Sequence, residues 1–180
     1  MHARIALPAF EALGPEGREV YDQILSSRGN IDGPFLAWLH SPKLASEAQA
    51  LGAFCRFGTS LTPPESEMLI LIVATHFRCG AEWDIHAPIA RGAGLTDTMI
   101  AAIAAGSISE DLEMRADRLA RCAWSLLRDN AIPEEIFAPA RDALGIPALV
   151  EAVGVIGYYS LVAMTLNAFA MAPDARTDTI

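Results

Sequence analysis

Residues 61–94 read LTPPESEMLILIVATHFRCGAEWDIHAPIARGAG, and this stretch gathers ionisable side chains inside an otherwise apolar, helix-patterned chain. Thr62 and Pro63, with Glu65 three residues after the threonine, signal a helix start, because the hydroxyl can accept from an unpaired backbone N–H and the glutamate can reach back. Gly80 is expected to interrupt this helix before a second one begins. The stretch therefore predicts two consecutive helices that meet near Cys79, the first with an apolar face made of Met68, Leu69, Ile72 and Val73.

Four side chains of these two helices are candidates for one catalytic cluster. Cys79, Glu82 and His86 lie at i, i+3 and i+7, which is one stripe if the second helix begins at or just before the cysteine. Glu67 lies one turn into the first helix and faces this stripe if the pair folds back on itself. Low dielectric and like charge both penalise the ionisation of two carboxylates at one point, so perturbed pKa values are expected. The pattern predicts a site for proton transfer, with Trp83 in its wall.

The same residues also fit a structural role. Glu82 and His86 are equally compatible with a solvated i, i+4 pair, and a single Cys79 in an apolar helix is commonly a small core residue. Glu65 is assigned to capping, because its Thr62 partner explains it. His76 is expected to be a merely polar position or to support the cluster without joining it.

The residues from Leu61 to Gly106 resemble the carboxymuconolactone decarboxylase and alkylhydroperoxidase D-like (AhpD-like) superfamily, through ESE at 65–67, CGAEWDIH at 79–86 and ARGAGLT at 90–96. The flanking GPFLAWLHSPKL at 33–44 and YYSLVAMTLN at 158–167 are similar to longer members. The resemblance implies an AhpD-like helical bundle that forms a homo-oligomer, trimeric or hexameric. It also implies an acidic proton relay at Glu67, the first cysteine of a C-x-x-C motif at Cys79, and the family's histidine at His86.

Glu82 departs from the peroxidase pattern, in which a second cysteine resolves the sulfenic acid formed on the first. The E-W-x-x-H form resembles the decarboxylase-like branch. It implies cofactor-free acid/base chemistry on a small carboxylated lactone or aromatic-catabolism intermediate, with His86 as general acid/base, Glu67 setting its tautomer and Glu82 assisting. The first alternative is thiol peroxidase activity at Cys79, which requires a low thiol pKa supported by the helix N-terminus and Arg78. The second alternative is a non-catalytic binding protein.

Composition limits the remaining possibilities. The chain has 180 residues, 52% of them hydrophobic and 19% charged, so residues 1–180 are expected to form a single domain. A net charge of −9 and a pI near 4.8 argue against nucleic acid and against an anionic membrane surface. The first residues lack the pattern of a signal peptide, which favours the cytoplasm.

The three cysteines show neither disulfide nor zinc spacing. Cys55 and Cys122 are expected to pack in the core, although either could approach Cys79 as a remote resolving thiol. A di-iron site needs paired E-x-x-H units, whereas Glu82 and His86 are four residues apart and unrepeated, so no metal is expected.

Helical patterns cover the rest of the chain, and no strand-like alternation is present, so the predicted class is all-α. Phe35 and Trp38 either roof the substrate pocket or pack as ordinary core aromatics. The expected helices outside residues 61–94 span about 15–27, 34–38, 42–57, 96–103, 109–129 and 133–145, with a last one from 147 onward.

The last helix contains a membrane-length run. Residues 152–172 are 21 consecutive uncharged residues, which meets the length of a transmembrane span. Polar and small residues such as Gly154, Gly157 and Asn167 interrupt the run, Glu151 abuts it, and no Lys/Arg cluster marks a cytoplasmic side. We therefore interpret it as a central core or subunit-contact helix.

Overall fold

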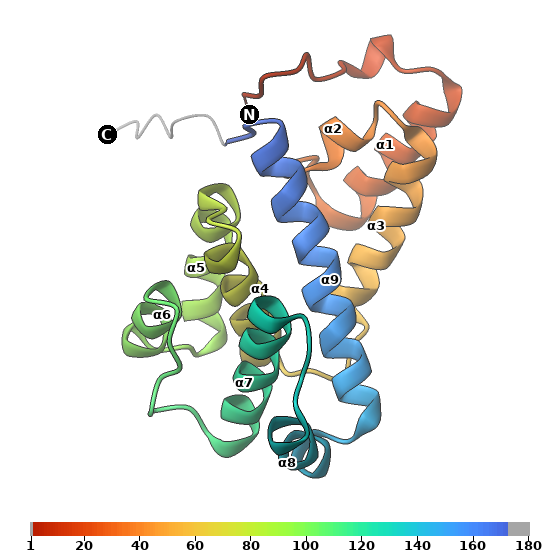
Figure 1. Cartoon of the computed structure of the whole chain (residues 1–180). Helices are drawn as coiled ribbons and strands as arrows, with labels where there is room; N and C mark the ends of the chain where they lie inside the picture. Colours follow the sequence, from red (N-terminus) through yellow and green to blue (C-terminus); the bar gives the residue numbers. More distant parts are fainter. Residues whose placement is uncertain (1, 173–180) are drawn as a thin grey trace.

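Helix α4 (Pro63–His76) is a central helix of this computed structural model, with other helices packed on several sides of it (Figure 1). Every residue from Glu65 to Ala74 is buried. It packs against α5 (Gly80–Ala93), α6 (Asp97–Ala104), α7 (Met114–Asp129) and α9 (Ile146–Ala168). A helix that is apolar nearly all round needs such surroundings, because it has no face suited to water.

The structure describes residues 2–172, and within them it contains nine α-helices and no β-strand. An isolated antiparallel bridge between His2 and Ala172 joins the two ends of this described part. The predicted all-α class is confirmed. The other elements are a short 3-10 helix at Phe10–Ala12, α1 (Pro15–Arg28), α2 (Phe35–Trp38), α3 (Pro42–Phe57) and α8 (Glu134–Leu144).

The start of α4 has the capping box that its sequence predicts. Thr62 Oγ1 accepts from the Glu65 backbone N–H at 3.4 Å, and Glu65 Oε2 accepts from the Thr62 N–H at 2.9 Å. Glu65 Oε1 also accepts from Arg115 Nε at 2.7 Å, which ties α7 to the start of α4. Its capping role is therefore confirmed, and its carboxylate is fully engaged there.

One helix boundary differs clearly from the sequence prediction. Helix α7 begins at Met114 rather than near Ser109, because the Ser109 hydroxyl accepts from the Asp111 N–H at 3.2 Å in a local turn. Helix α9 ends at Ala168, before the uncharged run ends. Short polar side chains that form hydrogen bonds to the nearby backbone compete with helix formation. Hydrophobic periodicity does not reveal such hydrogen bonds, so it does not predict where they delay a helix.

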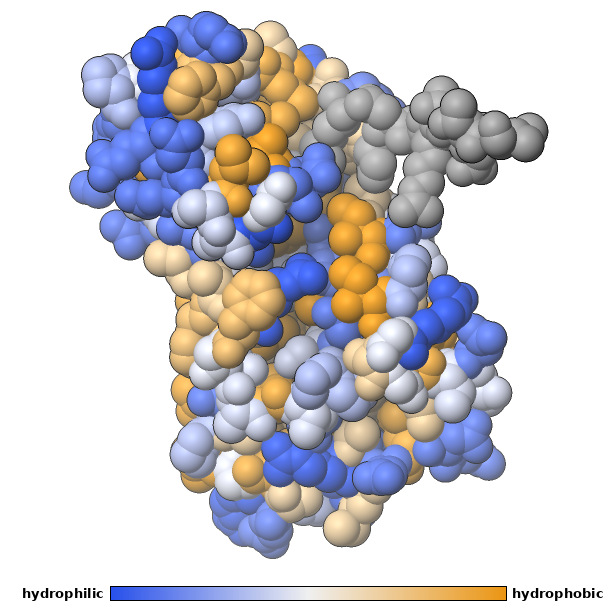
Figure 2. Space-filling model, turned by 180° about the vertical axis from the view of Figure 1, so that it is seen from behind, coloured by the Kyte–Doolittle hydropathy of each residue, from blue (hydrophilic) through white to orange (hydrophobic). Residues whose placement is uncertain are grey.

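Helix α9 is the one helix within residues 2–172 whose length and composition would allow it to cross a membrane, and 56% of its most apolar window is buried inside the fold. Burial of this kind is what a core helix shows. Hydrophobic residues nevertheless remain at the surface on one side of α9: Val150 is 65% exposed, and Ile146, Val153 and Met164 are about half exposed. Figure 2 shows the face opposite to that of Figure 1, where hydrophobic side chains gather in the middle, below a largely hydrophilic upper lobe.

Candidate active site

A tight turn folds α5 back along α4. Arg78 has a positive φ of 51°, and the Cys79 backbone N–H donates to the Ala74 carbonyl at 2.8 Å. Helix α5 then begins at Gly80, and these two helices pack along each other. The fold-back brings Glu67 of α4 against His86 of α5, although 18 residues separate them in sequence.

His86 and Glu67 form a buried hydrogen bond. The His86 Nδ1 atom lies 2.7 Å from Glu67 Oε2, and the two residues are only 3% and 7% exposed. With Glu67 ionised, Nδ1 carries the hydrogen and donates a hydrogen bond to the carboxylate, so the lone pair of a neutral ring lies on Nε2. Glu67 thereby sets both the tautomer and the orientation of the ring.

Glu82 lies on the other side of the same ring. Its Oε2 atom is 3.5 Å from His86 Nε2, too far for a good hydrogen bond, and this buried oxygen has no other hydrogen-bond partner within the described residues. Burial raises the pKa of the Glu82 carboxyl; the charges of His86 and Arg56 lower it, and that of Glu67 raises it. The net direction is upward, which favours a protonated acid that can donate a proton.

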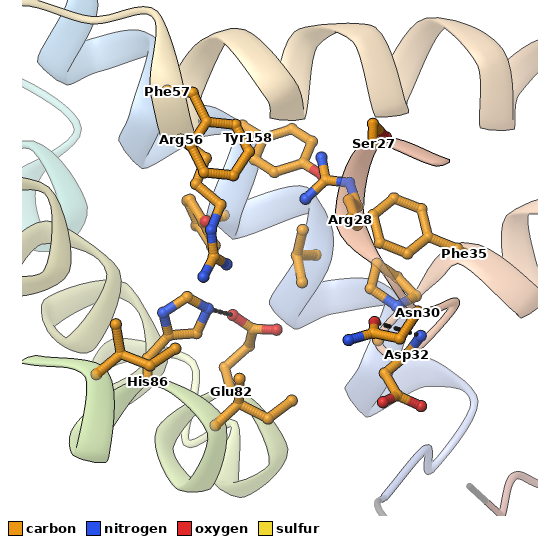
Figure 3. Close-up of a pocket in the computed structure, with 16 residues that line it drawn as sticks. Ser27, Arg28, Asn30, Asp32, Phe35, Arg56, Phe57, Glu82, His86 and Tyr158 are labelled. Carbon is orange, nitrogen blue, oxygen red and sulfur yellow. Dashed lines mark hydrogen bonds and ion pairs between the residues drawn. The ribbon is translucent and has the colours of Figure 1, made fainter. Parts of the chain in front are cut away.

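His86 and Glu82 line a cavity of about 560 Å³ between α5, α9 and the C-terminal ends of α1 and α3 (Figure 3). Phe57 and Ile89 lie in its wall and are also exposed, so the cavity reaches the surface beside them. A volume of this size suits a small organic molecule. The lining residues are Ser27, Arg28, Asn30, Asp32, Gly33, Pro34, Phe35, Arg56, Phe57, Glu82, Ile85, His86, Ile89, Tyr158, Tyr159 and Val162.

Two arginines and two tyrosines of this cavity were missed in the sequence. Arg28 and Arg56 lie in the last turns of α1 and α3, where basic residues are common because they face the negative end of the helix dipole. Tyr158 and Tyr159 lie in the middle of the apolar run of α9. Burial raises the pKa of Tyr158 to about 12 and that of Tyr159 further, so both phenols are neutral hydrogen-bond donors near pH 7.

Of the predicted pocket aromatics, only Phe35 lines the cavity. Trp83 does not line this cavity, because it follows Glu82 by one helical position and so lies on another face of α5. Trp38 fits the core-aromatic alternative: it is buried, and its Nε1 donates to Thr165 Oγ1 at 3.0 Å. His76 is exposed and contacts Phe77, so it lies outside the cluster.

Cys79 lies beside the cluster but does not line the cavity. It is the N-cap residue of α5, with non-helical backbone angles, so the expected helical stripe does not extend back to it. Burial raises the pKa of its thiol and the charge of Glu82 raises it further, while nearby backbone groups of α5 act in the opposite direction. The peroxidase alternative requires a lowered pKa for the Cys79 thiol, whereas burial shifts this pKa upward.

Cys55 and Cys122 lie in the hydrophobic core. Cys55 and Cys122 are both buried, and burial raises the pKa of each thiol, in line with core packing. Across residues 2–172, no three His, Cys, Asp or Glu side chains are grouped in a way that could hold a metal ion. The chemistry of the cluster is that of an imidazole between two carboxyl groups.

Comparison with known proteins agrees with this fold. Residues 42–123 match the model of the carboxymuconolactone decarboxylase family. No match to a curated protein was found. The fold of the chain is the helical fold of AhpD-like proteins, and residues 42–123 carry the match to the carboxymuconolactone decarboxylase family.

Three solved structures show how far the fold extends. An uncharacterized peroxidase-related protein from Ralstonia eutropha JMP134, with an alkylhydroperoxidase AhpD core, is 18% identical, with a TM-score of 0.80 over 97% of this chain and 94% of that one. A peroxidase-related protein from Silicibacter sp. TM1040 is 16% identical, with a TM-score of 0.78 over 98% and 94%. The debrominase Bmp8 is 14% identical, with a TM-score of 0.72 over 89% and 87%. At these identities the likeness shows the fold alone.

Proposed function

We propose that the protein is an enzyme that performs cofactor-free acid/base chemistry, decarboxylation or a related reaction, on a small carboxylated lactone or aromatic-catabolism intermediate. The observation that carries this proposal is the buried His86, which is hydrogen-bonded to Glu67 at 2.7 Å and exposes its other side to Glu82 and the cavity. An imidazole held by one carboxylate, beside a carboxyl group whose pKa burial raises, is a pairing suited to proton transfer to or from carbon.

The three side chains have distinct roles in this proposal. Glu67 holds the imidazole and stabilises the imidazolium that forms when Nε2 accepts a proton. In decarboxylation, the bond between carbon and the departing CO2 breaks, and its electron pair moves onto an adjacent carbonyl or lactone oxygen. The protonated Glu82 or the imidazolium then delivers a proton to carbon. A proton from solvent afterwards returns that side chain to its protonated form. Arg56, whose guanidinium is directed toward His86 and Glu82 in Figure 3, is placed to stabilise the developing negative charge.

Incubation with carboxylated unsaturated lactones and related β-keto acids tests this function directly. Release of CO2 and the mass of the product report decarboxylation, while exchange of carbon-bound hydrogen in deuterated water reports proton transfer without loss of CO2. We expect at least one substrate of this class to turn over at a rate that is independent of added metal or nicotinamide. A lack of both CO2 release and exchange across the panel would contradict the proposal.

Thiol peroxidase activity is the alternative, since two solved relatives of this fold are peroxidase-related proteins. We expect the Cys79 thiol to form sulfenic acid with peroxide at least about tenfold more slowly than an exposed cysteine, because burial raises its pKa and the thiolate is the reactive form. Mass spectrometry of trapped sulfenic acid measures this rate, with the Cys55→Ser and Cys122→Ser variants isolating Cys79. Rapid oxidation of Cys79 would instead favour the peroxidase.

The exposed hydrophobic face of α9 supports a proposal of homo-oligomerisation. Light scattering should give a mass that is a multiple of 19.2 kDa, consistent with a trimer or hexamer. Val150→Asp should shift the protein to smaller species, because Val150 is 65% exposed on this face and a charge there opposes burial in an interface. Ala101→Asp, at an exposed position of α6, is the control and should leave the mass unchanged. A monodisperse wild-type monomer would refute the proposal.

The proposed location is the cytoplasm, and the proposed ligand is a small carboxylated molecule. The net charge of −9 supports the further proposal that the partners include neither nucleic acid nor an anionic membrane surface.

A further inference from the structure

Arg28 carries a charge that nothing else in the described residues neutralises. Its guanidinium lies over the Phe35 ring at 4.7 Å from the centroid, and its only hydrogen bond within residues 2–172 is a long one of 3.5 Å to the Gln49 carbonyl. The Arg28 Nε atom is buried and has no hydrogen-bond partner, and no ion pair joins this guanidinium to a carboxylate of residues 2–172. An arginine stays charged at every physiological pH, so an unpaired one in a cavity wall favours an anion as its partner.

The acidic residue that shares the cavity does not serve as that partner. Asp32 lines the same cavity, but Figure 3 shows its carboxylate turned away from the Arg28 guanidinium. Its backbone N–H donates to Asn30 Oδ1, which fixes the loop after α1 in this arrangement. The guanidinium is instead directed toward Tyr158.

The side chains of Tyr158 and Arg28 both pack against Gly52 of α3. A Cβ atom at Gly52 of α3 would lie 2.2 Å from the Tyr158 hydroxyl oxygen and 2.8 Å from Arg28 Nη2, both closer than real contacts allow. Glycine is therefore required for these two groups to occupy this place together. The close approach puts a neutral phenol donor beside an unpaired guanidinium, which is a combination suited to the two oxygens of a carboxylate.

We propose that Arg28 and Tyr158 form an anchoring subsite for a substrate carboxylate, apart from the reacting groups at Glu82 and His86. This inference rests on the proposed function and deepens it, because it assigns different tasks to the two arginines. Arg56 is directed toward Glu82 and His86 at the reacting end, whereas Arg28 binds a carboxylate that stays on the molecule (Figure 3). The substrate class is a carboxylate on a planar or unsaturated carbon framework, because aromatic rings and aliphatic side chains form the wall between the two ends.

Binding of benzoate, measured by calorimetry in low-chloride buffer with benzamide as its neutral isostere, tests the subsite without any turnover. The wild type should bind benzoate at least about tenfold more tightly than benzamide. Arg28→Gln should weaken benzoate about 10- to 100-fold and change benzamide by less than about threefold, because only the charge-assisted hydrogen bonds are lost. Tyr158→Phe should weaken benzoate by a smaller factor. The control is Arg141→Gln, whose guanidinium pairs only with the adjacent Asp142, and it should bind benzoate as the wild type does.

A second pair of variants tests the geometry. Gly52→Ala should weaken benzoate because the added methyl group displaces the Tyr158 hydroxyl and Arg28, whereas Gly154→Ala, with no atom within 4 Å of the new Cβ, should not. Circular dichroism establishes that each variant is folded, and Arg28→Gln keeps the proposal testable if Gly52→Ala does not fold.

Two outcomes would overturn the subsite: equal benzoate binding by Arg28→Gln and the wild type, or no preference of the wild type for benzoate over benzamide. His86→Ala separates the subsite from the proposed function. It should lower turnover by about 10²- to 10⁴-fold while binding benzoate within about threefold of the wild type. A wild type that shows no turnover but still needs Arg28 to bind benzoate would refute only the proposed function.

Discussion

Replacing His86 with alanine should reduce kcat on any accepted carboxylated substrate by about 10²- to 10⁴-fold, which is the usual contribution of a positioned general acid or base. The physical reason is that Glu67 fixes one nitrogen of this ring at 2.7 Å and leaves the other beside Glu82, so no other imidazole reaches the same proton. Of the other histidines in the described chain, none lines the cavity.

The measurement is steady-state kinetics together with thermal unfolding. His76→Ala is the matched control, because His76 is exposed at the end of α4 and outside the cavity, and it should keep kcat within about twofold of the wild type. The His86→Ala variant must retain the helical circular dichroism spectrum for the loss to be chemical. Turnover by a folded His86→Ala enzyme at the wild-type rate would remove His86 from the mechanism.

The end of the cavity at Glu82 and His86 could be predicted from sequence, because these residues and Glu67 lie on two helices that follow each other in the chain. Thr62 and Glu65 define where α4 begins, Gly80 indicates a break, and helical periodicity then places Glu82 and His86 on one face. The fold-back that brings Glu67 to His86 needs only a short connection between two consecutive helices. For the same reason, the all-α class and most helix bounds followed from pattern alone.

The anchoring half could not be predicted, because its residues come from helices that are far apart in sequence. Arg28 and Tyr158 are separated by 129 residues, and no local pattern indicates that α1, α3 and α9 enclose one cavity. The sequence around Gly52 does not indicate that the Tyr158 hydroxyl lies against this glycine. Cys79 lies off the stripe of Glu82 and His86 for a different reason: it is the N-cap of α5, and its non-helical backbone angles end that stripe.

Replacing Glu82 with glutamine should abolish most of the activity and yet stabilise the fold at neutral pH. Glutamine keeps the shape of the side chain but cannot exchange a proton, so kcat should fall by about 10²-fold or more. The effect on stability follows from burial, which raises the pKa of the folded carboxyl above its ordinary value of about 4.5. Below that ordinary pKa, Glu82 is protonated in both the folded and the unfolded state, so its ionisation does not change the free energy of unfolding.

As pH rises above about 4.5, the unfolded carboxyl ionises freely while the folded one resists, so the wild type loses stability until the pH reaches the folded pKa. The glutamine variant lacks this loss, and its Tm relative to the wild type should therefore rise between pH 4 and pH 8. Glu151→Gln is the control of opposite sign. Hydrogen bonds from Ser60 lower the pKa of Glu151, so its replacement should remove stability that the wild type has above pH 4.5. A Tm difference for Glu82→Gln that is constant across this pH range would mean that Glu82 is not held in its protonated form, and the proposed acid would then have to be the imidazolium of His86 alone.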